Sequence, residues 1–122
     1  MKILLLTSDK KSLKIFSAGI AEDANIEVLW AMAGDEALNI IKNAEIQLVV
    51  ADEKLEDMTG LEFVKKLVTV NPFVNCALLS SLPHDDFHEA SEGLGILMQL
   101  PLQPEKKDAS ALLQYLNKIY NN

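Results

Sequence analysis

The residue whose type and position most clearly suggest chemistry is Asp52, which directly follows the apolar run Leu48–Ala51. A carboxylate at the end of a buried strand can act on a ligand, but Asp also commonly ends strands and caps turns. Acidic and hydroxyl side chains follow two further apolar runs of the chain. They are Thr7, Ser8 and Asp9 after the first run, and Ser80 and Ser81 after the fourth. Which role Asp52 has depends on whether the fold brings these groups beside it.

A second pattern with chemical potential is the pair His84 and His88, which stand four residues apart in PHDDFHEA. On a helix, this spacing would place two imidazoles on one face, where they could bind a metal. In a metalloprotease motif a Glu follows the first His, but here that residue is Asp85, and no third ligand is evident. We therefore interpret this segment as a solvated polar helix face.

The elements that must position these groups are five short apolar runs, whose composition is typical of strands buried on both faces. The runs are Ile3–Leu6, Ile26–Trp30, Ile46–Ala51, Cys76–Leu79 and Ile96–Leu100. Segments with helical spacing alternate with them, near residues 13–20, 37–41, 61–68, 83–91 and 105–120. This alternation predicts an α/β fold with a doubly wound, five-stranded parallel sheet in the order 2-1-3-4-5 and helices on both faces.

In such a sheet, ligands bind at the carboxyl ends of the strands where the winding direction reverses, between the first and third strands. Asp52, Glu53 and Lys54 follow the third strand at this point, and Thr7 to Asp9 follow the first. The topology thus makes Asp52 a candidate functional residue rather than only a strand-ending acid.

Composition sets the class of protein. The 122 residues suit one domain spanning 1–122, and the net charge of −7 with only 11 Lys and Arg argues against nucleic-acid binding. The single cysteine, Cys76, excludes an internal disulfide and is expected to be buried. The apolar stretch near the N-terminus is too short for a signal peptide or a membrane span. We expect a cytoplasmic domain without membrane contact.

The ordered set of short motifs resembles the receiver domain of response regulators. Asp52 is followed eight residues later by Gly60, which resembles the family's phosphoacceptor segment. AGDEAL at 33–38 is similar to the opening of the family's second helix. Gly93-Leu94 and Leu100-Pro101 match the family's Gly-Ala and Lys-Pro around the fifth strand. The resemblance covers essentially the whole chain and implies a flavodoxin-like fold and a role in two-component phosphorelay signalling.

The resemblance implies a set of site residues. Asp52 would be the phosphoacceptor, and the Ser80 hydroxyl would contact the phosphoryl group. Mg²⁺ would be held by Asp52, by the backbone carbonyl of Lys54 and obliquely by Asp9. Phosphoryl transfer depends on such positioning and on neutralisation of charge by a hard cation and an ammonium. The resemblance also implies a cis peptide bond between Leu100 and Pro101.

Several positions depart from this pattern. The acidic pair of the family aligns with Thr7 and Ser8, its Lys with Leu100, and its switch aromatic residue with Leu97. Each missing charge stabiliser typically costs about 10²–10³ in rate, although such losses do not simply multiply. We therefore expect weak Mg²⁺ binding at most and an atypical receiver that acts mainly through protein–protein interaction. It would not be an enzyme, beyond weak self-phosphorylation at Asp52.

Two alternatives remain. The chain could be a working receiver that a histidine kinase phosphorylates on Asp52. It could also be a flavodoxin-like domain that binds FMN, but TSDKKS after the first strand lacks the glycines of a phosphate loop. The expected partners are a histidine kinase or an output protein or domain. A homodimer would use the face formed by the fourth helix, the fifth strand and the fifth helix.

Overall fold

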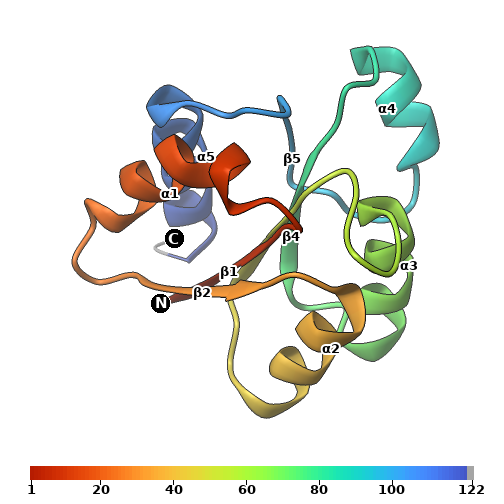
Figure 1. Ribbon diagram of the computed structural model, residues 1–122, viewed down its shortest axis with the longest axis horizontal. Coiled ribbons are helices and arrows are strands. Elements are labelled where there is room, and N and C mark those ends of the chain that lie inside the picture. The colour runs from red at the N-terminus through yellow and green to blue at the C-terminus, as the bar shows by residue number, and fades with distance from the viewer. Residues whose placement is uncertain (121–122) are drawn as a thin grey trace.

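The computed structural model describes residues 1–120, which form a five-stranded parallel sheet with helices on both faces (Figure 1). The strands are β1 (Lys2–Leu6), β2 (Glu27–Ala31), β3 (Leu48–Ala51), β4 (Asn75–Leu79) and β5 (Met98–Leu100). Their order in the sheet is β2-β1-β3-β4-β5, and every pairing is parallel. The predicted order is confirmed, so the carboxyl ends of β1 and β3 are neighbours at the point where the winding reverses.

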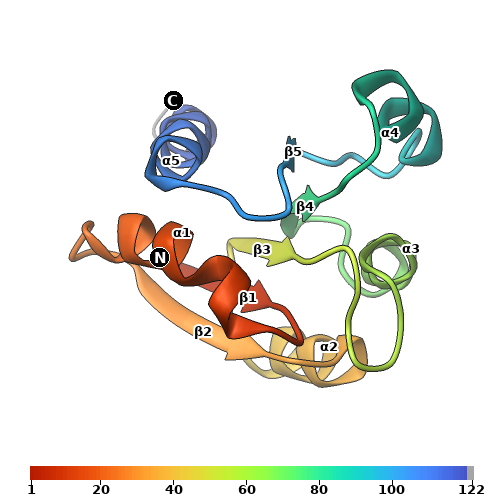
Figure 2. The ribbon, with the colours of Figure 1, turned by 45° about the horizontal axis from the view of Figure 1, so that its top comes forward.

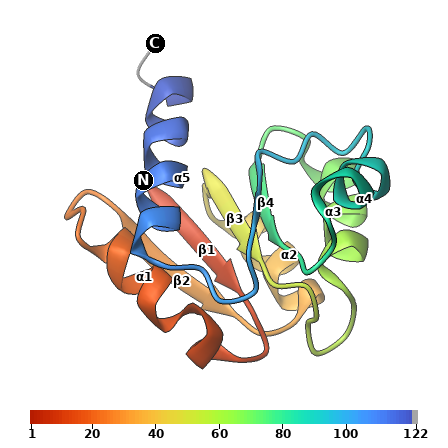
Figure 3. The ribbon, with the colours of Figure 1, turned by 90° about the horizontal axis from the view of Figure 1, so that it is seen from above.

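Helices cover the sheet in two layers, which Figures 2 and 3 show from two further directions. The helices are η1 (Lys10–Leu13, a 3₁₀ turn), α1 (Lys14–Ala21), α2 (Gly34–Asn43), α3 (Gly60–Val70), α4 (His84–Ala90) and α5 (Lys106–Tyr120). One core cluster lies between the sheet and α1 with α5, and the other between the sheet and α2, α3 and α4. Alternate residues of β1 enter opposite clusters, as expected of a strand buried on both faces. No helix within residues 1–120 is long and apolar enough to cross a membrane.

Strand β5 is shorter than the apolar run that predicted it. Gly93 and Gly95, with φ of 83° and 68°, turn the chain just before this strand. Such left-handed backbone suits glycine, because a Cβ would crowd the adjacent carbonyl. The other elements begin and end within a few residues of the prediction, and the structure adds the turn η1, which the helical pattern did not indicate.

The prediction of a cis bond between Leu100 and Pro101 is wrong, because this bond is trans. The Leu100 side chain is 2% exposed and lies in the core cluster under α1 and α5. Without a lysine whose ammonium must reach the edge of the sheet, the chain takes the isomer that X-Pro bonds favour by about 0.5–1 kcal/mol.

The burial of Cys76 is confirmed. Its side chain is 4% exposed inside the core of the sheet, and desolvation raises the pKa of its thiol to about 12. A thiol in this state behaves as a small apolar group rather than as a nucleophile.

Candidate functional site

Asp52 is half-buried at the carboxyl end of β3, where two neutral donors, the Thr7 hydroxyl and the Glu53 backbone N–H, bond to its carboxylate. The Thr7 hydroxyl donates to Oδ2 of Asp52 at 2.6 Å, and the Ser12 hydroxyl lies 3.3 Å from the same oxygen. The backbone N–H of Glu53 donates to Oδ1 at 2.7 Å. Thr7 is fully buried, so the residues around it hold its hydroxyl in this position. Each oxygen of Asp52 therefore accepts one close hydrogen bond.

Asp9 lines the same cleft as Asp52, but its carboxylate accepts a backbone N–H of the turn η1. Oδ1 of Asp9 accepts the backbone N–H of Lys11 at 3.1 Å and so caps the turn η1. The backbone N–H of Asp9 donates to Thr7 Oγ1 at 3.0 Å, which links the cap to the hydroxyl that holds Asp52. An Asp before a short polar turn is a common capping signal, and the sequence DKKS carries it.

An open cleft of about 310 Å³ joins these groups to the loop after β5. Asp9, Asp52, Glu53 and Lys54 are the charged residues in its lining, and Lys54 is the only cation among the lining residues of the described chain. The Lys54 carbonyl receives a single long contact from the Ser8 hydroxyl, at 3.5 Å. No ammonium reaches the cleft from position 100, because Leu100 is buried in the core.

Ser80 does not line this cleft, although it follows β4 at the same edge of the sheet. Its Oγ accepts the backbone N–H of Leu82 at 3.1 Å, and the residue lines a neighbouring cavity instead. The structure thus brings Asp9, Asp52 and Lys54 to one cleft and places Ser80 in the next.

Glu53 and Ser81 form a contact that the sequence interpretation missed. The backbone N–H of Ser81 donates to Oε2 of Glu53 at 2.7 Å, and its hydroxyl lies 2.9 Å from the same oxygen. The backbone N–H is the main cause that holds the pKa of Glu53 below its usual range, while burial acts in the opposite direction. β3 and β4 are parallel neighbours, so their carboxyl ends lie side by side. The presence of Glu53 after β3 and Ser81 after β4 could therefore have predicted this contact.

The spacing from Asp52 to Gly60 reflects close packing. A Cβ at Gly60 would collide with the backbone oxygen of Asp52 and lie 3.2 Å from Leu78 Cδ2. The backbone N–H of Gly60 donates to the Glu53 carbonyl at 3.0 Å. Thr59 and Glu62 cap the start of α3 reciprocally, so the helix begins at a fixed place beneath the strand end.

Asp57, in the loop between β3 and α3, caps the start of α2. Its carboxylate accepts the backbone N–H groups of Gly34 at 2.7 Å and Asp35 at 3.1 Å. These bonds, that of Gly34 first, hold the pKa of Asp57 below its usual range. The match of AGDEAL to a helix start therefore has a structural reason in this capping contact.

Metal binding finds little support in the arrangement of side chains. His84 and His88 are exposed and stacked, with ring centroids 6.5 Å apart, as expected of a solvated face. Within residues 1–120, no group of three or more His, Cys, Asp or Glu side chains converges to hold a metal ion. The Thr7 hydroxyl contacts Asp52 where the resemblance implies an acid, which leaves fewer of the carboxylate oxygens that Mg²⁺ prefers.

Comparison with known proteins places this fold and site in a family context. The family model of the response regulator receiver domain matches residues 3–101. A response regulator receiver protein of Anaeromyxobacter sp. (strain Fw109-5) is 28% identical over 101 residues, which cover 83% of this chain and 42% of that protein. Sporulation initiation phosphotransferase F of Bacillus subtilis is 22% identical over 94 residues, or 77% of this chain and 76% of that protein.

Solved structures show the same fold at low sequence identity. The receiver domain of the Francisella response regulator 1452 has a TM-score of 0.84 and 22% identity, with 98% of each chain covered. The chemotaxis response regulator CheY4 of Vibrio cholerae has a TM-score of 0.80 and 23% identity, with 94% of this chain and 97% of that chain covered.

Proposed function

The chain belongs to the response regulator receiver domains, and on this premise we propose that it is an atypical receiver that signals by binding protein partners rather than through an aspartyl phosphate. One observation carries the proposal. The buried Thr7 hydroxyl stands where the family resemblance implies an acid, and it holds Asp52 at 2.6 Å. Asp52, at the position of the family's phosphoacceptor, therefore accepts its hydrogen bonds from neutral donors.

The charges support the same conclusion. An aspartyl phosphate would add about two negative charges beside Asp9, Asp52 and Glu53. Transfer needs neutralisation of that charge, which in this family the resemblance assigns to Mg²⁺ and a lysine. Leu100 takes the lysine's position and lies in the core, and Asp9 caps η1. Losing one such stabiliser costs about 10²–10³ in rate, so efficient phosphorylation is not expected.

The residues present fit Mg²⁺ only poorly. Asp52 accepts hydrogen bonds at both oxygens, and Oδ1 of Asp9 accepts the backbone N–H of Lys11. The Lys54 carbonyl accepts one long contact, at 3.5 Å. With one available carboxylate where the family uses more, we expect a dissociation constant on the order of 1 mM or weaker.

The partners we propose are a histidine kinase or an output protein or domain in the cytoplasm. The surface formed by α4, β5 and α5 is the expected contact for such a partner or for a second copy. A cleft of about 380 Å³ between α4 and β5, lined in part by His84, His88 and Leu97, lies on this surface. Nucleic-acid contact by this domain is disfavoured by the net charge of −7.

A second candidate function is a receiver that accepts phosphate on Asp52. Two observations favour it: Asp52 is retained at the carboxyl end of β3, and one relative carries the name phosphotransferase. In this case Asp52→Asn would abolish output.

The proposal is tested by comparing the proteins that co-purify with wild type, with Asp52→Asn and with Glu56→Gln from the source organism. Glu56 is an exposed acid of the same loop without a side-chain hydrogen bond in the described chain, so its variant controls for the lost charge. We expect the same partners within a few-fold in all three. Loss of the partners in Asp52→Asn alone would support the phosphorylated receiver.

A further inference from the structure

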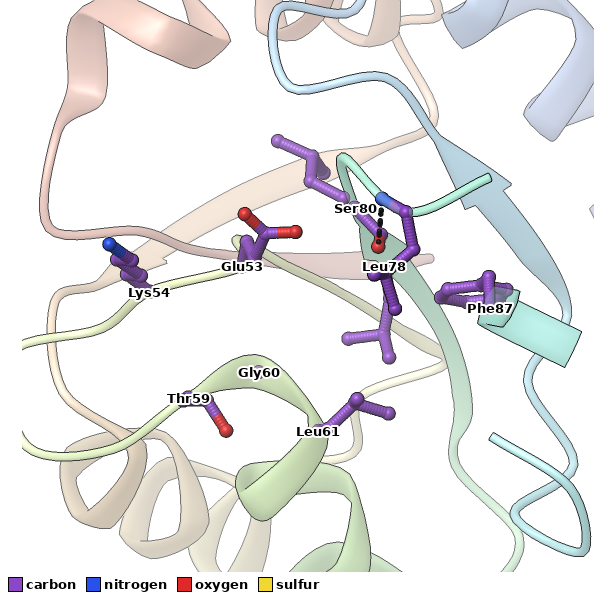
Figure 4. A pocket seen from close by; sticks show the side chains of 10 residues that line it. Glu53, Lys54, Thr59, Gly60, Leu61, Leu78, Ser80 and Phe87 are labelled. Carbon is purple, nitrogen blue, oxygen red and sulfur yellow. Dashed lines mark hydrogen bonds between the residues drawn. The ribbon is translucent and has the colours of Figure 1, made fainter. Parts of the chain in front are cut away.

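A second cavity, of about 250 Å³, lies beside the Asp52 cleft and does not include Asp52 (Figure 4). It opens between the end of β4 and the start of α3, and most of its wall is apolar. The apolar side chains are Leu61, Leu78, Leu79, Leu82 and Phe87, and the polar ones are Glu53, Lys54, Thr59 and Ser80.

The cavity stays open for reasons that are visible in its wall. Gly60 has no side chain, and a Cβ there would collide with the Asp52 backbone rather than fill the space. Leu78 and Phe87 are 2% and 6% exposed, so their positions are fixed by the core beneath. Leu82 is 38% exposed and lies at the mouth. The space is open to solvent on one side, so it is a surface cavity and not a void in the core.

The size of the cavity limits what it can hold. An apolar cavity of about 150 Å³ binds one benzene ring, and sites for drug-sized ligands begin at about 300 Å³. A volume of about 250 Å³ therefore suits a molecule with one or two rings.

The charged side chains that line the cavity are Glu53 and Lys54. Figure 4 shows the Glu53 carboxylate between Lys54 and Ser80, with the Lys54 ammonium on the side away from Phe87. Glu53 receives hydrogen bonds from Ser81, which keep it ionised and fix its direction, yet its oxygens retain free acceptor capacity. Asp52, whose Oδ1 accepts the Glu53 backbone N–H, brings the charged groups here to two acids and one cation. A ligand with a cationic head is thus favoured over one with an anionic head.

We propose that this cavity binds a small amphiphilic amine, with its ring against Leu61, Leu78 and Phe87 and its ammonium donating to Glu53. The inference goes beyond the proposed function and does not depend on whether Asp52 accepts phosphate. The lining includes residues of the segments that follow β3 and β4. A bound ligand would therefore contact both loops at the edge of the sheet that carries Asp52.

The test uses three probes that share a phenyl ring and differ in the head group: phenethylamine, toluene and phenylacetate. Each is titrated into ¹⁵N- and methyl-labelled wild-type protein at pH 7. For phenethylamine we expect a dissociation constant on the order of 1 mM, as its few heavy atoms allow. Its shifts should centre on Leu61, Leu78 and Leu82. Phenylacetate should bind at least about fivefold more weakly, since its charge repels Glu53.

Two variants test whether phenethylamine binds in the cavity. Leu61→Trp fills it and should weaken phenethylamine at least tenfold, while Val70→Trp, at the exposed end of the same helix, should leave binding unchanged. Glu53→Gln should remove the preference for phenethylamine over phenylacetate and keep the binding of toluene. The proposal is overturned if phenethylamine causes no saturable shifts at these leucines, or if phenylacetate binds as tightly in wild type. Neither of these two results requires a variant to fold.

Discussion

The bond between Thr7 and Asp52 can be tested by replacing Thr7 with valine, which keeps the shape of the side chain and removes its hydroxyl. The variant loses the 2.6 Å donation to Asp52 and the acceptor for the Asp9 backbone N–H. A hydrogen bond to a charged group contributes about 1.5–3 kcal/mol. Asp52 is half-buried and Asp9 exposed, so water replaces part of each loss. We expect the free energy of unfolding to fall by about 1.5–2.5 kcal/mol.

A double-mutant cycle with Asp52→Asn isolates the charged part of this bond. The amide can keep a neutral hydrogen bond with the Thr7 hydroxyl, and such bonds contribute about 1 kcal/mol. Thr7→Val should therefore cost about 1 kcal/mol less when Asp52 is replaced by asparagine than in wild type. Urea unfolding followed by circular dichroism measures all four free energies. A coupling energy below about 0.3 kcal/mol, or one of opposite sign, would refute the claim that Asp52 is held by Thr7.

Three further predictions concern the surroundings of the site. Gly60→Ala should destabilise the fold by about 1–3 kcal/mol, because its Cβ meets the backbone oxygen of Asp52. Gly34→Ala should cost less, because its Cβ meets the Met58 side chain, which can move more easily than backbone; thermal unfolding compares the two variants. The lowered pKa of Glu53 stabilises the folded state above the usual Glu range of about 4.3, and this contribution is lost as pH falls through the folded pKa. Glu53→Gln should therefore reduce the loss of unfolding free energy at acid pH. Ser81→Ala keeps the backbone N–H and should largely preserve that loss. If Glu53→Gln loses stability at acid pH as wild type does, the contact between Glu53 and Ser81 is not supported. At pH 8, iodoacetamide should alkylate Cys76 in the native protein on the order of 10³-fold more slowly than in urea, and equal rates would contradict its burial.

The sheet and its helices could be predicted from the sequence because their signals are local and repeated. Each buried strand is a short apolar run, and the stripe that includes Leu112 and Leu116 marks α5 unambiguously. The alternation of elements predicted parallel pairing, and the order of the strands was predicted as a usual one for a five-stranded doubly wound sheet of this length. The turn η1 escaped prediction because four polar and apolar residues carry no helical period, although Asp9 marked its start.

The site could be located but not described from the sequence. Topology placed Asp52, Asp9 and Lys54 at one edge, and the structure brings them to one cleft. It could not show that Asp9 caps η1, that Ser80 faces the next cavity or that Glu53 pairs with Ser81. Each of these depends on side-chain directions at strand ends, where the alternation of the strand no longer applies.

The cis bond was expected from the family alone, and the chain does not follow the family there. The residue before the proline is Leu100, which packs in the core instead of presenting an ammonium to the site. Resemblance therefore predicted the fold correctly and predicted this loop wrongly, at the position where the sequence itself departs from the family's pattern.

The most direct test of the central claim is intact-protein mass spectrometry after incubation with acetyl phosphate and Mg²⁺. The comparison is between wild type and the double variant Thr7→Asp/Ser8→Asp, which restores the acids that the resemblance implies and leaves Leu100 in the core. We predict no stable addition of a phosphoryl group to wild type, and a measurable addition to the double variant that Asp52→Asn abolishes. Ready phosphorylation of wild type at Asp52 would contradict the account.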